Sequence, residues 1–218
     1  KFCKIKLFKS LTIDIKEDSQ GNVWFATQGD GLWRLDKNNV WKQYKHVEND
    51  STSLVSDQVN CLAIGEKGQL YAATSEGLCE FLPSKGIFRR ISIDAPSQDF
   101  TSLVISQGVM WISTSKGIVK YTLGEPVQLF NKYDGLTCNQ FMPNAGLLAS
   151  DGRIYFGSTR GFNCFYPYLV KINQVAPPVA ITSVELFGQP IEAGSDQLEK
   201  SLSHAAELNL SHNENTIN

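Results

Sequence analysis

The 218-residue chain has no apolar run that approaches the roughly 20 residues of a membrane-spanning helix. Residues 1–10 also lack the long apolar stretch of a signal peptide. We therefore expect no membrane contact by this part of the protein, and we expect any anchor or export signal to lie outside the sequence.

An excess of charge of one sign is absent as well. Twenty Lys and Arg residues stand against 22 Asp and Glu residues, which gives a net charge of −2. A nucleic-acid-binding domain usually carries a basic patch that neutralises phosphates, so we predict no nucleic-acid partner. The chain is 42% hydrophobic and 19% charged, a composition typical of a folded domain that buries a core.

Histidine and cysteine are too few and too scattered for a zinc site. The three histidines are isolated, and the five cysteines show no C-x-x-C spacing. An odd number of cysteines leaves at least one thiol unpaired, and Cys61 and Cys79 are expected on the first and third strands of one sheet. Two strand spacings of ~4.8 Å exceed the ~7 Å Cα separation that a disulfide spans. We predict free thiols, no metal and no cofactor.

The chain does contain a phrase that occurs four times: a Gly turn, a strand with an aromatic residue, a Thr or Ser, and a second strand led by Gly. The aromatic residue is Trp24, Tyr71, Trp111 or Tyr155, so the period is 40 to 47 residues. A period of roughly 40 to 50 residues with several short strands is the signature of a β-propeller blade. No segment shows a sustained helical period, and the sequence therefore predicts an all-β fold.

Each blade needs four antiparallel strands, here named a to d from the propeller axis outwards. They are predicted at 11–16, 22–27, 31–35 and 40–45, then at 59–64, 69–74, 78–82 and 87–92, and then at 101–106, 109–114, 117–122 and 126–131. The fourth blade has strands at 145–150, 153–158 and 161–166, and its outermost strand has no clear signal. The blades cover about 11–58, 59–100, 101–140 and 141–172, an incomplete part of a ring.

The turns between strands a and b offer a choice between turn chemistry and a cation site. Asp14, Glu17 and Asp18 could form a calcium loop, but only turn residues recur in all copies. The recurrent Gly supplies the positive φ of a tight hairpin. We therefore favour turns over calcium.

The aromatic residues offer a choice between packing and exposure. Those that recur at one strand position are predicted to pack between blades. Trp33 and Trp41 recur less regularly and are better candidates for exposure, although Trp41 aligns near Phe88 of an outer strand, which favours packing.

The repeat pattern ends after Tyr168. Residues 173–178 include Pro177 and Pro178 and are predicted to be a linker. Strands are expected at 179–187 and 207–210 within a second segment, 179–218. Forty residues with so few strands fall far short of the ~100 residues of a sandwich domain, so we expect only the first part of such a domain.

Three stretches of the chain resemble parts of one known family of receptors. Residues 17–27 with Gly31 and Leu32 resemble the two-component regulator propeller repeat. Residues 131–141 and 151–167 are similar to the last blade of those sensors. Residues 177–187 and 208–215 resemble the opening of the immunoglobulin-like triple-tyrosine domain that follows it.

This resemblance implies the periplasmic sensor region of a Bacteroidetes hybrid two-component system. In that family two seven-bladed propellers and an immunoglobulin-like domain are joined by a membrane helix to a histidine kinase, a receiver and a DNA-binding output. Typical ligands are oligosaccharides, and the immunoglobulin-like domains pair, so a homodimer is implied. Residues 1–172 would be the C-terminal part of the second propeller. Tyr71 and Tyr155 depart from the Trp most typical of the repeat, so ligand specificity is not carried over.

Three function classes remain open at this point. The first is a non-catalytic module that senses an oligosaccharide and controls glycan-utilisation genes through the downstream domains. The second is a propeller enzyme, such as a polysaccharide lyase or glycosidase, which would need convergent carboxylates, a His base or a metal. His46, His204 and His212 form no obvious cluster, so no catalytic residue is predicted. The third is a protein-binding scaffold.

Strand direction indicates where a ligand could bind. Because neighbouring strands are antiparallel, the b–c turns and the d-to-a crossovers share one face of the propeller, which we call the turn face. Variable polar residues on a rigid scaffold suit recognition. The ligand-binding candidates are the b–c turn residues Gln28, Asp30, Ser75, Glu76, Ser115, Lys116, Thr159 and Arg160.

Overall fold

The computed structural model describes residues 8–170, 183–192, 195, 198, 208 and 210. The chain divides into two compact units, 1–170 and 171–218. The predicted linker at 173–178 lies outside the described residues, as do residues 179–182, 207 and 209 of the predicted strands. In the second unit the structure describes a short hairpin, β16 (Glu185–Leu186) with β17 (Gln189–Pro190). The immunoglobulin-like identity of 179–218 stays a prediction.

The first unit is all β, as the sequence predicts, and consists of four antiparallel sheets in chain order. Blade 1 contains β1 (Thr12–Glu17), β2 (Val23–Thr27), β3 (Leu32–Leu35) and β4 (Trp41–Tyr44). Blade 2 contains β5 (Val59–Ile64), β6 (Leu70–Thr74), β7 (Gly77–Leu82) and β8 (Ile87–Ile91). Blade 3 contains β9 (Phe100–Ser106), β10 (Val109–Thr114), β11 (Gly117–Tyr121) and β12 (Gln128–Phe130). Blade 4 contains β13 (Phe141–Leu148), β14 (Ile154–Ser158) and β15 (Gly161–Phe165).

The fourth blade differs most from the sequence prediction. Its inner strand begins at Phe141 rather than at residue 145, because Phe141 already pairs with Ser158. The register then jumps to Gly146 opposite Phe156, and Asn144 inside this bulge has a φ of 52°. No outer strand follows β15 among the described residues, since a 3-10 turn, η2 (Pro167–Leu169), takes its place. In the other blades the strand bounds differ from the prediction by at most two residues.

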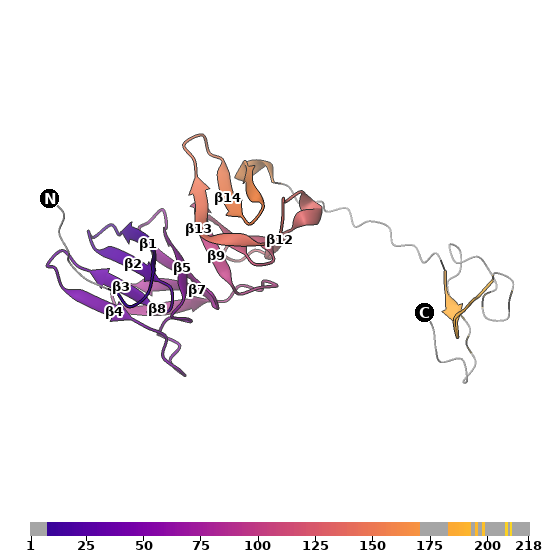
Figure 1. Cartoon of the computed structure of the whole chain (residues 1–218), viewed down its shortest axis with the longest axis horizontal. Helices are drawn as coiled ribbons and strands as arrows, with labels where there is room; N and C mark the ends of the chain where they lie inside the picture. Colours follow the sequence, from indigo (N-terminus) through magenta and orange to yellow (C-terminus); the bar gives the residue numbers. More distant parts are fainter. Residues whose placement is uncertain are drawn as a thin grey trace. The chain divides into compact units, whose positions relative to one another are not determined.

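The four sheets pack face to face around their innermost strands. Figure 1 shows β1, β5, β9 and β13 gathered in the middle of the unit, with β4 and β12 at its edge. The inner strand of blade 2 is buried over almost its whole length because a sheet covers each of its faces. The inner strands of blades 1 and 4 have one open face, where Ile15 is 54% and Leu147 59% exposed.

The recurrent aromatic position lies between blades, as predicted. Trp24 is fully buried, and its ring centroid lies 4.7 Å from that of Phe81 in the next blade. Trp111 is equally buried, 4.8 Å from Phe165. Burial of such rings provides most of the attraction between sheets.

The carboxylates of the first blade bind backbone and indole N–H groups. Asp18 accepts hydrogen bonds from Trp24 Nε1 at 2.7 Å and from the Asn22 backbone N–H at 2.9 Å. Asp14 crosses to the next blade and accepts the N–H of Leu62 at 2.9 Å. Asp18 and Asp14 therefore stabilise the fold through hydrogen bonds to backbone and indole N–H groups. Among the described residues, no group of three His, Cys, Asp or Glu side chains could hold a metal ion.

The thiol prediction is confirmed for the four cysteines that the structure describes. Cys61, Cys79, Cys138 and Cys164 are all free. Burial, together with the nearby charge of Asp14, raises the pKa of Cys61 to about 11, so this thiol stays protonated and behaves as a small hydrophobic group.

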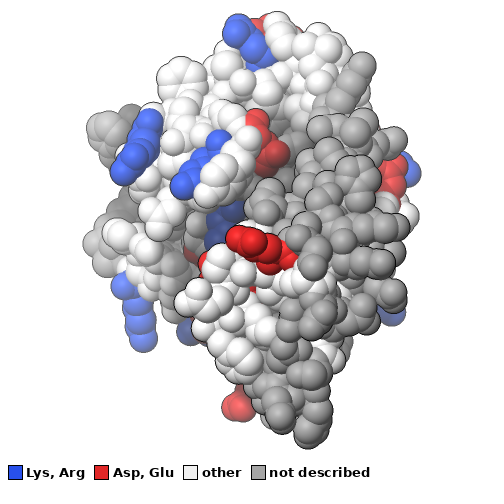
Figure 2. All heavy atoms as spheres, turned by 90° about the vertical axis from the view of Figure 1, so that its right-hand side faces the viewer, with Lys and Arg blue, Asp and Glu red and all other residues white. Residues whose placement is uncertain are grey.

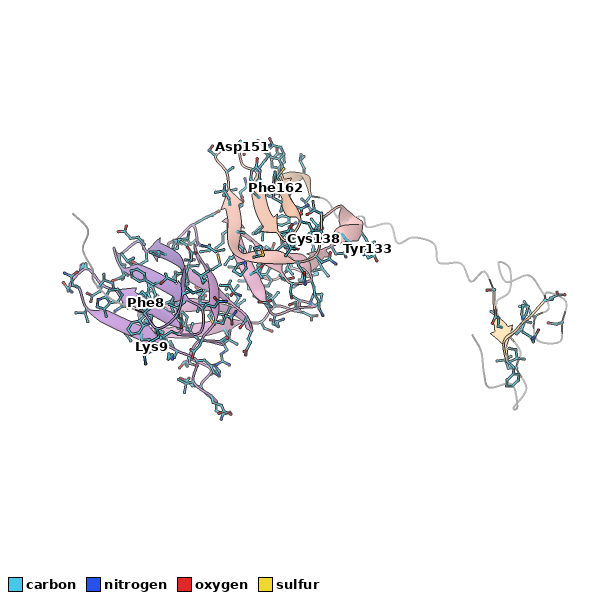
Figure 3. The ribbon with its side chains drawn as sticks, in the orientation of Figure 1. Phe8, Lys9, Tyr133, Cys138, Asp151 and Phe162 are labelled. Atoms are coloured by element: carbon cyan, nitrogen blue, oxygen red, sulfur yellow. The ribbon has the colours of Figure 1, made fainter. Side chains whose placement is uncertain are left out.

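Trp33 and Trp41 are half-buried rather than exposed. Phe8 packs against Trp33 at a centroid distance of 5.6 Å and against Trp41 at 5.8 Å, and Phe25 lies 5.4 Å from Trp41. Figure 3 shows Phe8 lying on the strands of blade 1. The four rings form one aromatic cluster on the open face of this blade.

We expect Asp18→Ala to lower the free energy of unfolding by about 1–3 kcal/mol, because the Trp24 indole and the turn N–H groups lose a charged acceptor. Burial alone would raise the pKa of Asp18, but hydrogen bonds from Trp24, Asn22 and Gln20 outweigh it and lower the pKa. The stabilisation is therefore present at neutral pH and is lost as the pH falls below about 4 through the folded-state pKa. Urea denaturation of the wild type and of Asp18→Ala, at neutral pH and below about pH 4, measures the difference between their free energies of unfolding.

Asp151→Ala is the matched control. Asp151 lies in the a–b turn of blade 4 and bonds only to Arg153, without a buried indole. Its replacement should cost clearly less than that of Asp18. Equal losses for the two variants, or a loss for Asp18→Ala that does not shrink in acid, would contradict the assigned role.

Candidate functional site

Each b–c turn is closed by the hydroxyl group of the residue that ends the second strand. This hydroxyl donates to the carbonyl oxygen of the Gly that leads into the third strand and accepts the N–H of the residue before that Gly. The donors are Thr27, Thr74, Thr114 and Ser158, at 2.6, 2.9, 3.0 and 3.0 Å from the oxygens of Gly31, Gly77, Gly117 and Gly161. The donated N–H groups belong to Asp30, Glu76, Lys116 and Arg160. The Thr or Ser of the repeated phrase therefore fixes the turn.

The Gly in this turn meets two separate requirements. Gly117 has a φ of 129°, in the region that side chains disfavour. A Cβ atom on Gly117 would also overlap the carbonyl oxygen of Phe130, and one on Gly31 would overlap that of Tyr44. The outer strand can therefore approach the turn only where Gly stands.

The crossovers between blades bond directly to the b–c turns. The carbonyl oxygen of Asp57 accepts the N–H groups of Gly29 at 3.2 Å and Gly31 at 2.9 Å. Ser56 and Ser75 join their hydroxyls at 2.9 Å, and Ser97 and Ser115 do so at 2.8 Å. Blade 4 has Cys138 and Thr159 at the corresponding positions, 3.8 Å apart. The structure thus places b–c turns and crossovers on one face, as strand direction predicts.

The eight candidate residues fall into two groups on the turn face. One group makes side-chain hydrogen bonds within the protein and consists of Asp30, Ser75, Ser115 and Thr159. Gln28, Glu76, Lys116 and Arg160 are exposed, and their side chains make no hydrogen bond or ion pair with the described residues. The second group has its polar groups available to a ligand.

Asp30 is the most constrained of the candidates. Its carboxylate accepts from Trp33 Nε1 at 3.2 Å and Gln43 Nε2 at 3.0 Å, and Lys45 Nζ lies 3.3 Å away. Burial alone would raise the pKa of Asp30, but these partners outweigh it and lower the pKa. Lys45 also approaches Asp57 at 3.8 Å, so it joins turn and crossover.

A crossover adds an aromatic side chain to the turn face. Tyr133 is 86% exposed and belongs to η1 (Lys132–Asp134), a 3-10 turn held by a capping box between Asn131 and Asp134. Figure 3 shows Tyr133 projecting from this turn. The sequence places the crossover on this face, and the capping box fixes the backbone from which the ring projects.

Charge on the described surface is mixed. In Figure 2, charged side chains of both signs stand among uncharged described residues. His46 is the one histidine within the described part of the chain, and its Nδ1 lies 2.9 Å from the carbonyl oxygen of Leu54. The helices of the described part are single turns, and none has the length and apolar character needed to cross a membrane.

The similarities between this chain and known proteins differ in how much of the chain they cover. Residues 8–29 match the family model of the two-component regulator propeller. The chain is 25% identical over 206 residues to Histidine kinase P4 of Formosa agariphila, a match that covers 90% of this chain and 15% of the kinase.

Among solved structures, the extracellular domain of the hybrid two-component system protein BT3049 from B. thetaiotaomicron is similar, with a TM-score of 0.67 and 25% identity. That match covers 82% of this chain and 25% of the solved extracellular-domain chain. Virginiamycin B lyase from Staphylococcus aureus shares the fold, at a TM-score of 0.52 and 15% identity, with 69% of this chain and 54% of the lyase covered. The chain thus spans a small part of the histidine kinase that it matches.

We expect Thr114→Val to lower the free energy of unfolding by about 1–3 kcal/mol, since valine keeps the shape but leaves the Gly117 carbonyl and the Lys116 N–H without their buried partner. Thr114 is 1% exposed. Thr159→Val, in an exposed position of another b–c turn, is the control and should change stability little. Chemical denaturation of both variants provides the test. A neutral Thr114→Val would show that the hydroxyl does not hold the turn.

Proposed function

We propose that this chain, which carries a two-component regulator propeller repeat and resembles the extracellular domains of hybrid two-component systems, is a non-catalytic ligand-sensing part of such a receptor. The match to a histidine kinase over 90% of the chain supports this assignment. So does the likeness to BT3049, because both similarities extend over most of the propeller unit. The kinase and output activities belong to other parts of a receptor of this kind.

The ligand class that we propose is an oligosaccharide, bound on the periplasmic side of the membrane. The turn face presents exposed donors and acceptors, including Glu76, Lys116 and Arg160, on turns that hydroxyl bonds hold rigid. Tyr133 adds an exposed ring, and aromatic faces pack well against the C–H faces of sugars. A pre-organised polar surface lowers the entropy cost of binding. Homodimerisation of the complete receptor, which couples binding to kinase output, is part of the same proposal.

A propeller enzyme is the second candidate, since virginiamycin B lyase shares the fold. Fold similarity at that identity carries no function. The carboxylates of Asp14, Asp18 and Asp30 are occupied by backbone, indole, amide and ammonium donors. Their engagement in structure favours sensing over catalysis.

We expect calorimetry of the chain against a panel of oligosaccharides to detect binding. Lys116→Ala combined with Arg160→Ala should weaken it about tenfold, the equivalent of about 1.4 kcal/mol in lost hydrogen bonds. Lys67→Ala, an exposed cation in an a–b turn on the opposite face, is the matched control and should leave affinity unchanged.

Two results would overturn the proposal. One is the absence of oligosaccharide binding. The other is turnover of a bound saccharide by the wild-type chain, detected as new reducing ends or unsaturated products, which would favour the enzyme.

A further inference from the structure

A cavity of about 360 Å³ lies between blade 2 and blade 3 at their outer part, away from the b–c turns. We call it the Tyr71 cleft. Its walls include Tyr71, Glu80, Arg89, Ile91, Met110 and Tyr121. The volume falls within the roughly 300–1,000 Å³ of small-molecule sites.

The cleft exists because one interblade contact departs from the pattern of the other two. Trp24 packs against Phe81, and Trp111 packs against Phe165, each pair under 5 Å between centroids. At the corresponding positions of the middle interface stand Tyr71 and Tyr121.

These two smaller rings make no aromatic contact of that kind, and the space between them stays open. The neighbouring strand changes as well. Arg34 and Lys120, the cross-strand partners of the two tryptophans, each lie 5.8 Å from the indole ring. The partner of Tyr71 is Glu80, which pairs with Arg89 of the outer strand. Tyr71, Tyr121 and Glu80 thus place polar groups where the other two interfaces have an apolar contact.

The polar groups of the cleft are not all used within the protein. Glu80 is 7% exposed, and its Oε2 accepts from Nε of Arg89 at 3.1 Å and also from Nη2. The other carboxylate oxygen of Glu80 makes no hydrogen bond with the described residues, and neither do the hydroxyls of Tyr71 and Tyr121. Burial, with the charge of Glu80, raises the pKa of Tyr71, so its hydroxyl remains a donor at neutral pH.

The arrangement combines apolar walls, two phenol hydroxyls and the Glu80–Arg89 ion pair. Arg90 also lines the cleft, but its guanidinium donates to the carbonyl oxygens of Asp50 and Leu54. We propose that the Tyr71 cleft binds a neutral polyhydroxylated ring, such as one residue of a saccharide. Ring hydroxyls donate to the free oxygen of Glu80 and accept from Arg89 and from the phenols. The C–H face of the ring packs against Met110 and Ile91. The inference deepens the proposed function, because it adds a second saccharide subsite away from the turn face.

Methionine labelling allows a direct test, since the chain has only two methionines. Met110 lines the cleft, and Met142 lies on β13, outside it. In methyl-¹³C-methionine protein titrated with glucose, galactose, arabinose or xylose, at least one sugar should shift the Met110 signal and leave Met142 unchanged. Tyr71→Phe and Tyr121→Phe should each weaken binding about three- to tenfold through a lost hydrogen bond. Tyr168→Phe, at an exposed tyrosine outside both the cleft and the turn face, is the matched control and should bind like the wild type.

Tyr71→Trp separates binding from folding. It restores the residue of the neighbouring interfaces, so it should fill the cleft and abolish the Met110 response while the thermal midpoint stays the same or rises. An unresponsive Met110, wild-type affinity in Tyr71→Trp, or tighter binding of glucuronate than of the neutral sugars would overturn the inference. If oligosaccharide binding depends on Lys116 and Arg160 while Met110 stays silent, the cleft is wrong and the proposed function stands. If Met110 responds but the turn-face variants bind oligosaccharides normally, the cleft stands and the turn face is wrong.

Discussion

The packing of one sheet against the next is the constraint on which this propeller unit depends. A four-stranded sheet has two faces, and the blade gains stability when a neighbouring sheet covers the apolar side chains of a face. The chain meets this need with a large aromatic residue at one position of each second strand, directed at the following blade. Trp24 and Trp111 are fully buried there. Tyr155 occupies the same position on blade 4 and is only half-buried, because no described sheet covers that face.

This constraint leaves the turn face free to vary. The core lies between the sheets, so the b–c turns need only the hydrogen bonds that close them and contribute little to the core. A Thr or Ser hydroxyl and a Gly close each turn with the same two kinds of hydrogen bond, although the turn of blade 1 is one residue longer than the others. The residue before the Gly can therefore differ in charge between Glu76, Lys116 and Arg160 in turns of one length. Constant geometry with variable chemistry is the property that recognition requires.

The repeat was sufficient to predict the fold, because the same Gly turns, aromatic position and Thr or Ser mark the strands in each copy. The start of β13 was not predictable in the same way. It depends on a bulge at Asn144, whose side chain reaches the carbonyl oxygen of Ile13 in the first blade at 2.9 Å. The half-burial of Trp33 and Trp41 depends on Phe8, which precedes the first predicted strand.

The candidate site was predictable in place but not in detail. Strand direction put the b–c turns and crossovers together, yet the sequence could not tell which side chains the protein itself uses. From the sequence Asp30 is an ordinary turn aspartate, and only the structure brings Gln43 of the outer strand and Lys45 just after it to its carboxylate. The Tyr71 cleft could not be predicted from the sequence for a related reason. Tyrosine in place of tryptophan reads as a conservative change within one strand, and only the opposing Tyr121 turns it into a cavity.

The two proposed ligand sites would act on the protein differently. Ligands shift a conformational equilibrium only by the difference in their affinity for its states. The b–c turns are bonded to their own blade and to the crossovers, so a ligand there has little blade-to-blade contact to alter. A ligand in the Tyr71 cleft would touch both sheets at the interface with the fewest aromatic contacts, and its binding energy would add directly to the packing of blade 2 on blade 3. In a receptor built from such blades, the interblade site is therefore the better placed to convert binding into a change of shape.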